Sequence, residues 1–227
     1  MLYIVSTPIG NLDDLSLRQA RTLVASDYIL AEDTRSVQTL LNAMVTRFKL
    51  KTSGSTLISY YKEKEFEKLP FILDLLKQDK IVSLVSESGT PLISDPGYLL
   101  VKTVIKEKLP MMVIPGPSAL TTSVLYSSFN PANIMYLGFL PKKTSAILQL
   151  IDRMKMIKHI LHDIIFVFYE SPKRINDTLK LLDQSIPDAD ICICREMTKK
   201  FEEIIRGKPK ELLNRTYKGE ISMVIKL

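Results

Sequence analysis

Three short clusters of opposite charges are the residues of this chain best suited to acid–base or electrostatic chemistry. Each directly follows an apolar run that is typical of a buried β-strand. The clusters are Glu32–Arg35, Glu170–Arg174 and Arg195–Lys200. Carboxylates and cations placed in this way can form a polar reaction chamber beside an apolar ligand slot. The alternative is that the opposite charges within each cluster only form salt bridges with one another.

Loops rich in proline and glycine also follow the predicted strands. The longest, Ser86–Gly97, comes directly after the apolar run Ile81–Val85. Proline fixes φ, and glycine lets the backbone approach a ligand closely. Similar loops are Thr7–Asn11, Pro115–Ser118, Phe139–Pro141 and Glu170–Pro172. Together they predict a ligand site at the carboxyl ends of strands, where open α/β sheets bind their ligands. The alternative is that the prolines only terminate the strands.

Several familiar kinds of site are absent from the sequence. No Gly-x-Gly occurs, which excludes the Rossmann fingerprint and the phosphate-binding P-loop. His159 and His162 lie beside Lys155 and Lys158, which indicates a solvated basic face, and a metal pair there would lack a third ligand. We therefore expect no metal. Cys192 and Cys194 occupy one face of a predicted strand, which indicates buried, reduced thiols as in a cytoplasmic protein.

In the first half of the chain, apolar runs alternate with segments of helical periodicity, which predicts an α/β fold with a largely parallel sheet. In the first half, strands are predicted over 3–6, 28–31, 81–85 and 111–114, and helices over 15–24, 35–44, 63–78 and 97–108. In the second half, strands are predicted over 135–138, 164–169, 191–195 and 220–226, and helices over 118–127, 144–161, 175–182 and 208–214. Residues 51–56 form a predicted polar loop, and Asp95 followed by Pro96 predicts the N-cap of the helix over 97–108. We expect two α/β domains, 1–116 and 117–227, with a ligand cleft between them.

The net charge of +6 is concentrated in the second half of the 227-residue chain. Up to Gly116 there are 14 Lys and Arg against 13 Asp and Glu, and beyond it 17 against 12. This excess is compatible with a polyanionic partner such as RNA, and equally with ordinary solubility. We expect no secretion signal, because the first residues form an apolar strand without a basic lead. We also expect no membrane span and a cytoplasmic location.

Seven motifs, in chain order, carry a resemblance to a known family. They are Thr7–Leu12, Ala31–Arg35, Gly89–Gly97, Pro115–Ala119, Gly138–Pro141, Tyr169–Pro172 and Thr198–Glu203. The chain resembles the small-subunit ribosomal RNA (cytidine-2′-O)-methyltransferase I family of the tetrapyrrole methylase-like superfamily. The resemblance implies a class III methyltransferase that uses S-adenosyl-L-methionine, bound in a cleft between two α/β domains. It also implies that the partners are small-subunit (16S) rRNA or the assembled subunit, and a second copy in a homodimer.

The resemblance further implies which residues bind the cofactor. By analogy with the superfamily, they are Pro8, Ile9 and Gly10 on one side, Gly89, Thr90 and Ile93 as the floor, Ser118 and Ala119 at the opposite end, and Tyr169 and Met197 from the second half. A ribose hydroxyl is a weak acid, so a general base or a cation that stabilises the alkoxide would assist its methylation. The leading candidates are Lys199 and Asp33, followed by Glu32, Arg35, Glu170, Arg174 and Glu196.

The chain departs from the family pattern at positions that affect the acceptor more than the cofactor. Both histidines expected within Ser59–Glu65 are absent, and Lys173 stands where a histidine is expected. Glu87 and Ser88 replace the expected Asp-Ala before Gly89. Two alternatives therefore remain open. One is a methyltransferase of the same superfamily acting on a tetrapyrrole or another non-RNA acceptor, and the other is a non-catalytic ribosome-associated binding module.

Overall fold

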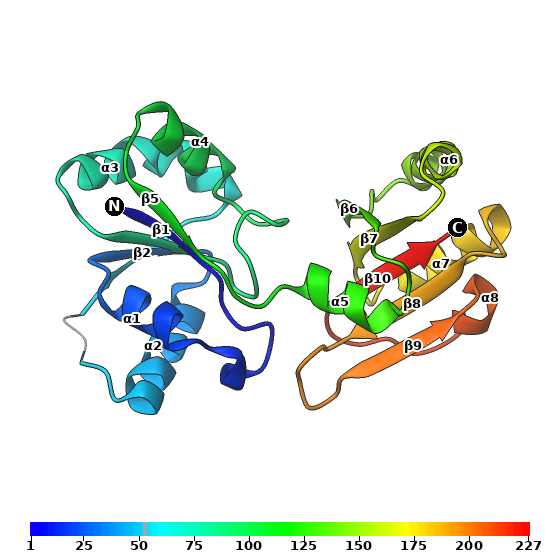
Figure 1. The fold of residues 1–227 in the computed structure, drawn as a ribbon, viewed down its shortest axis with the longest axis horizontal. Coiled ribbons are helices and arrows are strands. Elements are labelled where there is room, and N and C mark those ends of the chain that lie inside the picture. The colour runs from blue at the N-terminus through cyan, green and yellow to red at the C-terminus, as the bar shows by residue number, and fades with distance from the viewer. Residues whose placement is uncertain (52–53) are drawn as a thin grey trace. The chain divides into compact units, whose positions relative to one another are not determined.

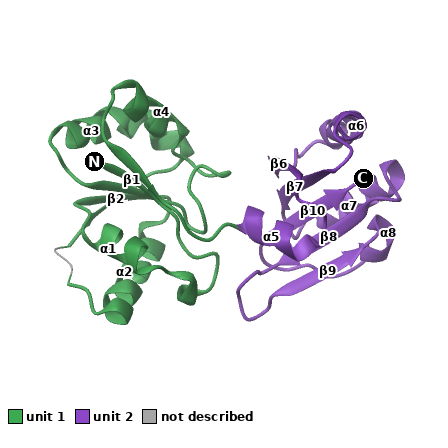
Figure 2. Cartoon of the chain, in the orientation of Figure 1, with its two compact units in different colours: residues 1–118 green, residues 119–227 purple. Residues whose placement is uncertain are grey.

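The computed structural model describes residues 1–51 and 54–227 (Figure 1). It divides into two compact units, Met1–Ser118 and Ala119–Leu227 (Figure 2). The predicted junction at Pro115–Pro117 lies just before this division. Within the predicted polar loop over 51–56, residues 52 and 53 lie outside the described residues. Each unit has its own sheet and hydrophobic core.

Unit 1 is built on a five-stranded parallel sheet, with the strands in the order β3-β2-β4-β1-β5. The strands are β1 (Leu2–Val5), β2 (Tyr28–Ala31), β3 (Thr56–Ser59), β4 (Val82–Val85) and β5 (Met111–Ile114). Val5 pairs with Val85 on one side and with Ile114 on the other, so β1, β4 and β5 end level with one another. The parallel sheet predicted for this half is confirmed. The edge strand β3 was not predicted, because its four residues are short of apolar signal and are only partly buried.

Helices cover both faces of this sheet. They are α1 (Leu17–Val24), α2 (Thr34–Phe48), α3 (Glu65–Lys77) and α4 (Tyr98–Lys106), with short 3-10 helices η1 (Leu12–Asp14) and η2 (Lys62–Lys64). Successive side chains of a strand point to opposite faces. Accordingly, Ile4 joins the core with α3 and α4, while its neighbour Val5 joins the core with α1 and α2. Figure 1 shows the two helix pairs on opposite sides of the sheet.

The start of α4 differs from the prediction. Asp95 does not cap this helix; the N-cap residue is Gly97, whose φ of 124° only glycine adopts readily. The carboxylate of Glu65, on α3, takes the role instead. Its Oε1 accepts hydrogen bonds from the backbone N–H groups of Gly97 at 3.1 Å and Leu99 at 2.8 Å. The cap of α4 thus comes from another helix, α3. The Asp95 carboxyl does not act as the cap.

Unit 2 has a mixed five-stranded sheet in the order β6-β7-β10-β8-β9. The strands are β6 (Asn133–Phe139), β7 (Ile164–Glu170), β8 (Asp190–Arg195), β9 (Glu203–Gly207) and β10 (Ile221–Lys226). Only β6 and β7 are parallel, and the other pairs are antiparallel. The largely parallel arrangement predicted from the first half of the chain does not extend to this unit. Here a short segment joins β8 to β9 as an antiparallel hairpin, where a parallel pair would need a crossover connection.

Unit 2 also carries helices on both faces of its sheet. They are α5 (Ala119–Ser127), α6 (Thr144–Ile160), α7 (Ile175–Ser185) and α8 (Pro209–Leu212). Phe166 and Phe168 of β7 face the core that contains α6 and α7. The opposite face meets α5 at Cys192 and Cys194, which are buried free thiols with their Sγ atoms 3.7 Å apart. Their predicted burial is confirmed.

The structure bears on two wider expectations. Within residues 1–51 and 54–227, no helix combines the length and apolar character that crossing a membrane requires. Over the same residues, no group of three or more His, Cys, Asp or Glu side chains is arranged to hold a metal ion. His159 and His162 are both exposed, in keeping with the predicted solvated face.

The capping role of Glu65 is testable. We expect Glu65→Ala to lower the free energy of unfolding by about 1 kcal/mol, the usual cost of losing an N-cap acceptor. Equilibrium urea denaturation followed by circular dichroism measures the change. The control is Glu67→Ala, which removes a neighbouring exposed carboxylate that pairs with Lys64 at the surface, and it should leave stability nearly unchanged. Equal losses in the two variants would contradict the role of Glu65.

Candidate active site

The loops after β1, β4 and β5 are joined by hydrogen bonds. The backbone N–H of Thr7 donates to the Gly89 carbonyl at 2.8 Å. The Thr90 hydroxyl donates to the Pro117 carbonyl at 3.2 Å and lies 3.2 Å from the Ser6 hydroxyl. Because a hydroxyl has only one proton to donate, Ser6 donates to Thr90. The three loops are therefore held as one piece.

Gly89, in the loop after β4, lies close to both of the other loops. Its φ is 83°, in the left-handed region that favours glycine. A Cβ atom at this position would lie 3.2 Å from Ile9 Cγ2 and 4.0 Å from Ser118 Cα. The structure thus brings together Ile9, Gly89 and Ser118, each from a different loop and each predicted from the family resemblance.

Helix α1 fixes the base of the same cluster. The Gln19 side-chain amide donates to the Ser6 carbonyl at 3.0 Å and to the Pro115 carbonyl at 3.4 Å. Gly116 is required beside it, because a Cβ atom there would lie 2.0 Å from Gln19 Nε2. Gln19 is fully buried. Gln19 was not predicted from the sequence, because a glutamine in an amphipathic helix carries no distinguishing signal.

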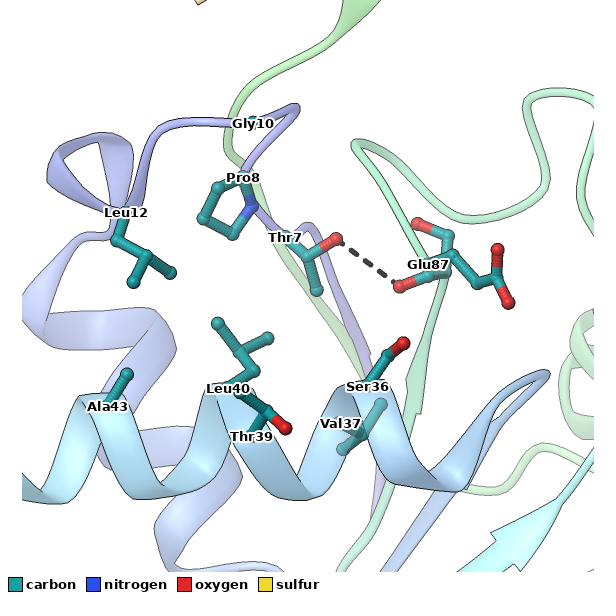
Figure 3. Close-up of a pocket in the computed structure, with 11 residues that line it drawn as sticks. Thr7, Pro8, Gly10, Leu12, Ser36, Val37, Thr39, Leu40, Ala43 and Glu87 are labelled. Atoms are coloured by element: carbon teal, nitrogen blue, oxygen red, sulfur yellow. Dashed lines mark hydrogen bonds between the residues drawn. The ribbon is translucent and has the colours of Figure 1, made fainter. Parts of the chain in front are cut away.

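A pocket of about 200 Å³ lies between the loop after β1 and helix α2 (Figure 3). Pro8, Leu12, Val37, Leu40 and Ala43 supply most of its apolar lining, and Thr7, Gly10, Ser36, Thr39, Ser86 and Glu87 complete it. The Thr7 hydroxyl donates to the Ser86 carbonyl at 3.3 Å, which joins two of its walls (Figure 3). The α2 residues were missed, although their spacing of three and four places them on one helix face.

A second, more polar cavity of about 410 Å³ is lined by several carboxyl groups, and two of them, Glu32 and Asp95, come from the loops after different strands. Glu32 follows β2, and Asp95 lies in the loop after β4. Burial, together with the charges of Glu32 and Glu87, raises the pKa of Asp95 to about 6. Asp95 is therefore ready to exchange a proton near neutral pH. The remaining lining residues are Lys62, Glu63, Glu65, Ser94, Pro96 and Tyr98.

Asp33 and Arg35 form an exposed ion pair at the start of α2. Asp33 is the N-cap, and its carboxylate accepts from the Arg35 backbone N–H at 2.8 Å and from the Arg35 guanidinium at 3.1 Å. The Arg35 side chain is 91% exposed. The hydrogen bonds from Arg35 hold the pKa of Asp33 below its ordinary value, so Asp33 is a weak base at neutral pH.

Glu170 and Arg174 form a buried internal contact of unit 2. The Glu170 side chain has no exposed surface and accepts from Arg174 Nε at 2.9 Å and from the Thr178 hydroxyl at 2.7 Å. Arg174 also donates to the carbonyls of Leu140 and Pro141, at 3.1 and 3.2 Å. The partners of these two side chains belong to the fold, which is the salt-bridge alternative that the sequence left open.

Lys199 lies between two carboxylates. Its Nζ donates to Glu196 at 3.0 Å and to Glu220 at 2.8 Å. Burial acts to lower the pKa of Lys199, but the hydrogen bonds to Glu220 and Glu196 outweigh it, and the net shift is upward. Lys199 therefore stays a cation at neutral pH. It can stabilise negative charge on an oxygen, but it cannot accept a proton.

The other predicted cofactor residues lie in both units. Pro8 and Gly10 line the pocket of Figure 3, and Ile93 is partly buried in the loop after β4. In unit 2, Ala119 begins α5, Met197 is buried, and Tyr169 is the second-to-last residue of β7 and lies beside Phe139 and Tyr136. The Tyr169 ring centroid is 5.6 Å from that of Phe139 and 5.3 Å from that of Tyr136.

Comparison with known proteins gives consistent matches along the chain. Residues 1–213 match the family model described as Tetrapyrrole (Corrin/Porphyrin) Methylases. A protein of Hydrogenobaculum sp. is 39% identical over 99% of this chain and 94% of its own length. A protein of Thermotoga maritima is 39% identical over 99% of this chain and 97% of its own length. Both relatives are named "Ribosomal RNA small subunit methyltransferase I".

Two solved structures share the fold. The methyltransferase CobJ aligns with a TM-score of 0.70 at 15% identity, over 99% of this chain and 92% of its own. A uroporphyrin-III-C-methyltransferase from Thermus thermophilus aligns with a TM-score of 0.64 at 13% identity, over 99% and 93%. The predicted tetrapyrrole methylase-like α/β fold is thereby confirmed.

The raised pKa of Asp95 predicts a pH-dependent effect on stability. The folded protein holds this proton more tightly than the unfolded chain, so the associated stability is present at low pH and is lost as the pH rises through about 6. Asparagine cannot ionise, so Asp95→Asn should be more stable than the wild type above pH 6 and equal to it near pH 4. A shift from 3.8 to about 6 corresponds to about 3 kcal/mol. Solvent screening at this partly exposed group reduces the expected gain to about 1 kcal/mol.

Urea denaturation at pH 8 and pH 4 measures this difference. The exposed Asp163→Asn is the control for losing a surface carboxyl. A gain in stability of Asp95→Asn at pH 8 that persists unchanged at pH 4 would contradict the raised pKa of Asp95. So would an equal gain in Asp163→Asn.

Proposed function

The chain belongs to the tetrapyrrole (corrin/porphyrin) methylase family, and from this premise we propose that it methylates the 2′-oxygen of a cytidine ribose in small-subunit ribosomal RNA, using S-adenosylmethionine. The observation that carries the proposal is the 39% identity, over almost the whole chain, to relatives named for methylation of small-subunit rRNA. The family resemblance found in the sequence is confirmed by the same matches.

The residues of unit 1 fit this cofactor. At Gly89 the loop after β4 has no side chain, and Ile9 and Ser118 approach it from the two neighbouring loops. A bound cofactor would therefore contact backbone at this point of the loop. We propose that the cofactor is held by Pro8, Ile9, Gly10, Gly89, Thr90, Ile93 and Ser118 of unit 1, together with Ala119, Tyr169 and Met197 of unit 2. When bound, S-adenosylmethionine supplies a methyl group on a positively charged sulfur, which a suitably placed oxygen can attack directly.

The main task of the protein in such a reaction is to position the acceptor. Holding two reactants in the correct geometry contributes about 7–11 kcal/mol toward lowering the barrier. Rigid loops serve this purpose, and the hydrogen bonds among Thr7, Gly89, Thr90 and Pro117 supply that rigidity.

The acceptor hydroxyl must also lose its proton. We propose that Lys199 stabilises the developing negative charge on the 2′-oxygen, since it remains a cation. Asp33 stays a candidate for the base, as do Glu32 and Glu196. Asp95 joins them on the structural evidence, because a base works best when its pKa is near the operating pH. Arg35 could orient Asp33. Glu170 and Arg174 would stabilise the loops of unit 2 and would not take part in proton transfer.

The remaining expectations follow from an RNA acceptor. The positive charge concentrated beyond Gly116 would favour a polyanion. We propose that the partner is the rRNA itself or the assembled small subunit, that the reaction takes place in the cytoplasm, and that the protein acts as a homodimer.

Transfer of a radiolabelled methyl group tests the proposed function. The purified protein is incubated with labelled S-adenosylmethionine and, separately, with small subunits, with free small-subunit rRNA, and with a tetrapyrrole acceptor. We expect label in the RNA, and nuclease digestion with mass spectrometry should identify 2′-O-methylcytidine. Label in the tetrapyrrole instead, or methylation of a base, would contradict the proposal. Cofactor binding without transfer to any acceptor would favour a non-catalytic binding module.

Replacement of Lys199 tests its role. Removing one group that stabilises a developing oxyanion costs about 10²–10³ in kcat, so we expect Lys199→Ala to lose about a hundredfold in kcat with little change in cofactor Kd by calorimetry. Lys199→Arg keeps the cation and should recover part of the loss. The control is Lys200→Ala, which removes an exposed neighbouring cation that lies over the Phe201 ring. A kcat for Lys199→Ala within twofold of the wild type, or parallel losses in kcat and cofactor affinity, would exclude the role.

A further inference from the structure

The carboxyl ends of β6 and β7 place two polar loops side by side in unit 2. These strands are parallel neighbours, and Phe139 at the end of β6 pairs with Tyr169 near the end of β7. Leu140–Lys143 follows β6, and Ser171–Arg174 follows β7. Both loops therefore emerge at the same edge of the sheet.

Arg174 joins the two loops. Its guanidinium donates to the carbonyls of Leu140 and Pro141, and also to the carboxylate of Glu170. Glu170 is buried and forms an ion pair with Arg174. The two loops are thus fixed relative to each other, and the Glu170 carboxylate pairs with Arg174 and not with their lysines.

Three cations gather on these loops. Lys142, Lys143 and Lys173 are exposed, and within residues 1–51 and 54–227 the structure shows no ion pair to any of them. Lys199 and Lys208 of the same unit are, in contrast, paired with carboxylates. Unpaired lysines grouped on a rigid edge produce a local positive potential that attracts phosphate groups.

The strand end from which these loops emerge also carries an exposed aromatic ring. Phe139 is 59% exposed, although it is large and apolar. Its ring rests against Tyr169 in an edge-to-face contact at 68°, which holds it in place without covering it. An exposed ring on a sheet edge that also carries cations is the combination used by proteins that bind single-stranded nucleic acid, in which bases stack on aromatic rings and lysines contact the phosphates.

We propose that Phe139, Lys142, Lys143 and Lys173 form a binding surface for single-stranded RNA, with a base stacked on Phe139 and the adjoining phosphates on the three lysines. The proposal rests on the RNA acceptor proposed above and assigns part of its recognition to this edge of unit 2. The lysines contribute affinity that does not depend on sequence, and Phe139 selects unpaired nucleotides over a duplex.

Fluorescence anisotropy with a labelled single-stranded oligoribonucleotide containing cytidine, over a series of salt concentrations, tests this surface in the full-length protein. Each phosphate contact to a single strand contributes about 0.7 to the slope of log K against log salt. The triple variant Lys142→Gln, Lys143→Gln, Lys173→Gln should therefore lower the slope by about 2. Stacking on an aromatic ring is worth about 1–3 kcal/mol, so Phe139→Ala should weaken binding at least fivefold and leave the salt slope unchanged.

A matched triple variant controls for net charge. Lys180→Gln, Lys210→Gln, Lys226→Gln removes three exposed lysines of the same unit and should keep nearly the wild-type slope. Circular dichroism melting checks that every variant folds. Equal slopes for the two triple variants, or an unchanged affinity for Phe139→Ala, would overturn the proposal. So would a Phe139→Ala variant that keeps its RNA affinity but changes its sedimentation coefficient, because Phe139 would then lie between copies of the chain.

The same experiment separates this proposal from the proposed function. Wild-type protein that methylates rRNA while all variants bind RNA normally would refute the surface alone. Wild-type protein that binds S-adenosylmethionine but neither binds nor methylates RNA would refute both.

Discussion

The hydrogen bond from the Thr7 backbone to the Gly89 carbonyl is the contact on which the rest of the candidate site depends. It joins the loop after β1 to the loop after β4, and the Thr90 hydroxyl extends the connection to Pro117 after β5. The parallel sheet makes this possible, because β1, β4 and β5 end level with one another. Gln19 secures the arrangement from α1. The loops therefore lie close together at Gly89, where a Cβ atom would meet Ile9 Cγ2 at 3.2 Å.

In such a site, rigid backbone and a few charged side chains have different roles. The backbone can hold a cofactor, whereas the charged groups differ in what they can do. Glu170 is buried against Arg174 and stabilises unit 2, and Asp33 is held ionised at the surface by Arg35. Lys199 remains a cation between two carboxylates, and Asp95 has a pKa near neutral. The electrostatic surroundings therefore assign different capabilities to residues that looked equivalent in the sequence.

Much of the fold was predictable, because buried strands are marked by continuous apolar runs. β2 and β5 begin and end at the predicted residues, and β7 and β8 differ by one residue. The strands that were missed, β3 and β9, lie at sheet edges, where partial exposure removes the apolar signal. The antiparallel pairing of unit 2 could not be predicted from the alternation rule, since that rule does not recognise a hairpin.

The candidate site was predictable in part. Ile9, Gly89 and Ser118 were identified through motifs, and the structure shows that their loops meet. The environment of Asp95 could not be predicted, because the cap of α4 comes from Glu65, about thirty residues earlier in the chain. The pocket against α2 was also missed, since it arises only when that helix packs beside the loop after β1. Tertiary contacts decide both features.

Calorimetric titration of S-adenosylmethionine into Gly89→Ala and Gly54→Ala tests the central claim most directly. Both glycines have a φ of 83°, a region in which any other residue is strained. A Cβ atom at Gly54 has no neighbour within 4 Å, whereas at Gly89 it meets Ile9 at 3.2 Å. We expect cofactor affinity to fall at least tenfold in Gly89→Ala and to stay near the wild-type value in Gly54→Ala. Equal affinities in the two variants would contradict a cofactor cradle at the ends of β1, β4 and β5.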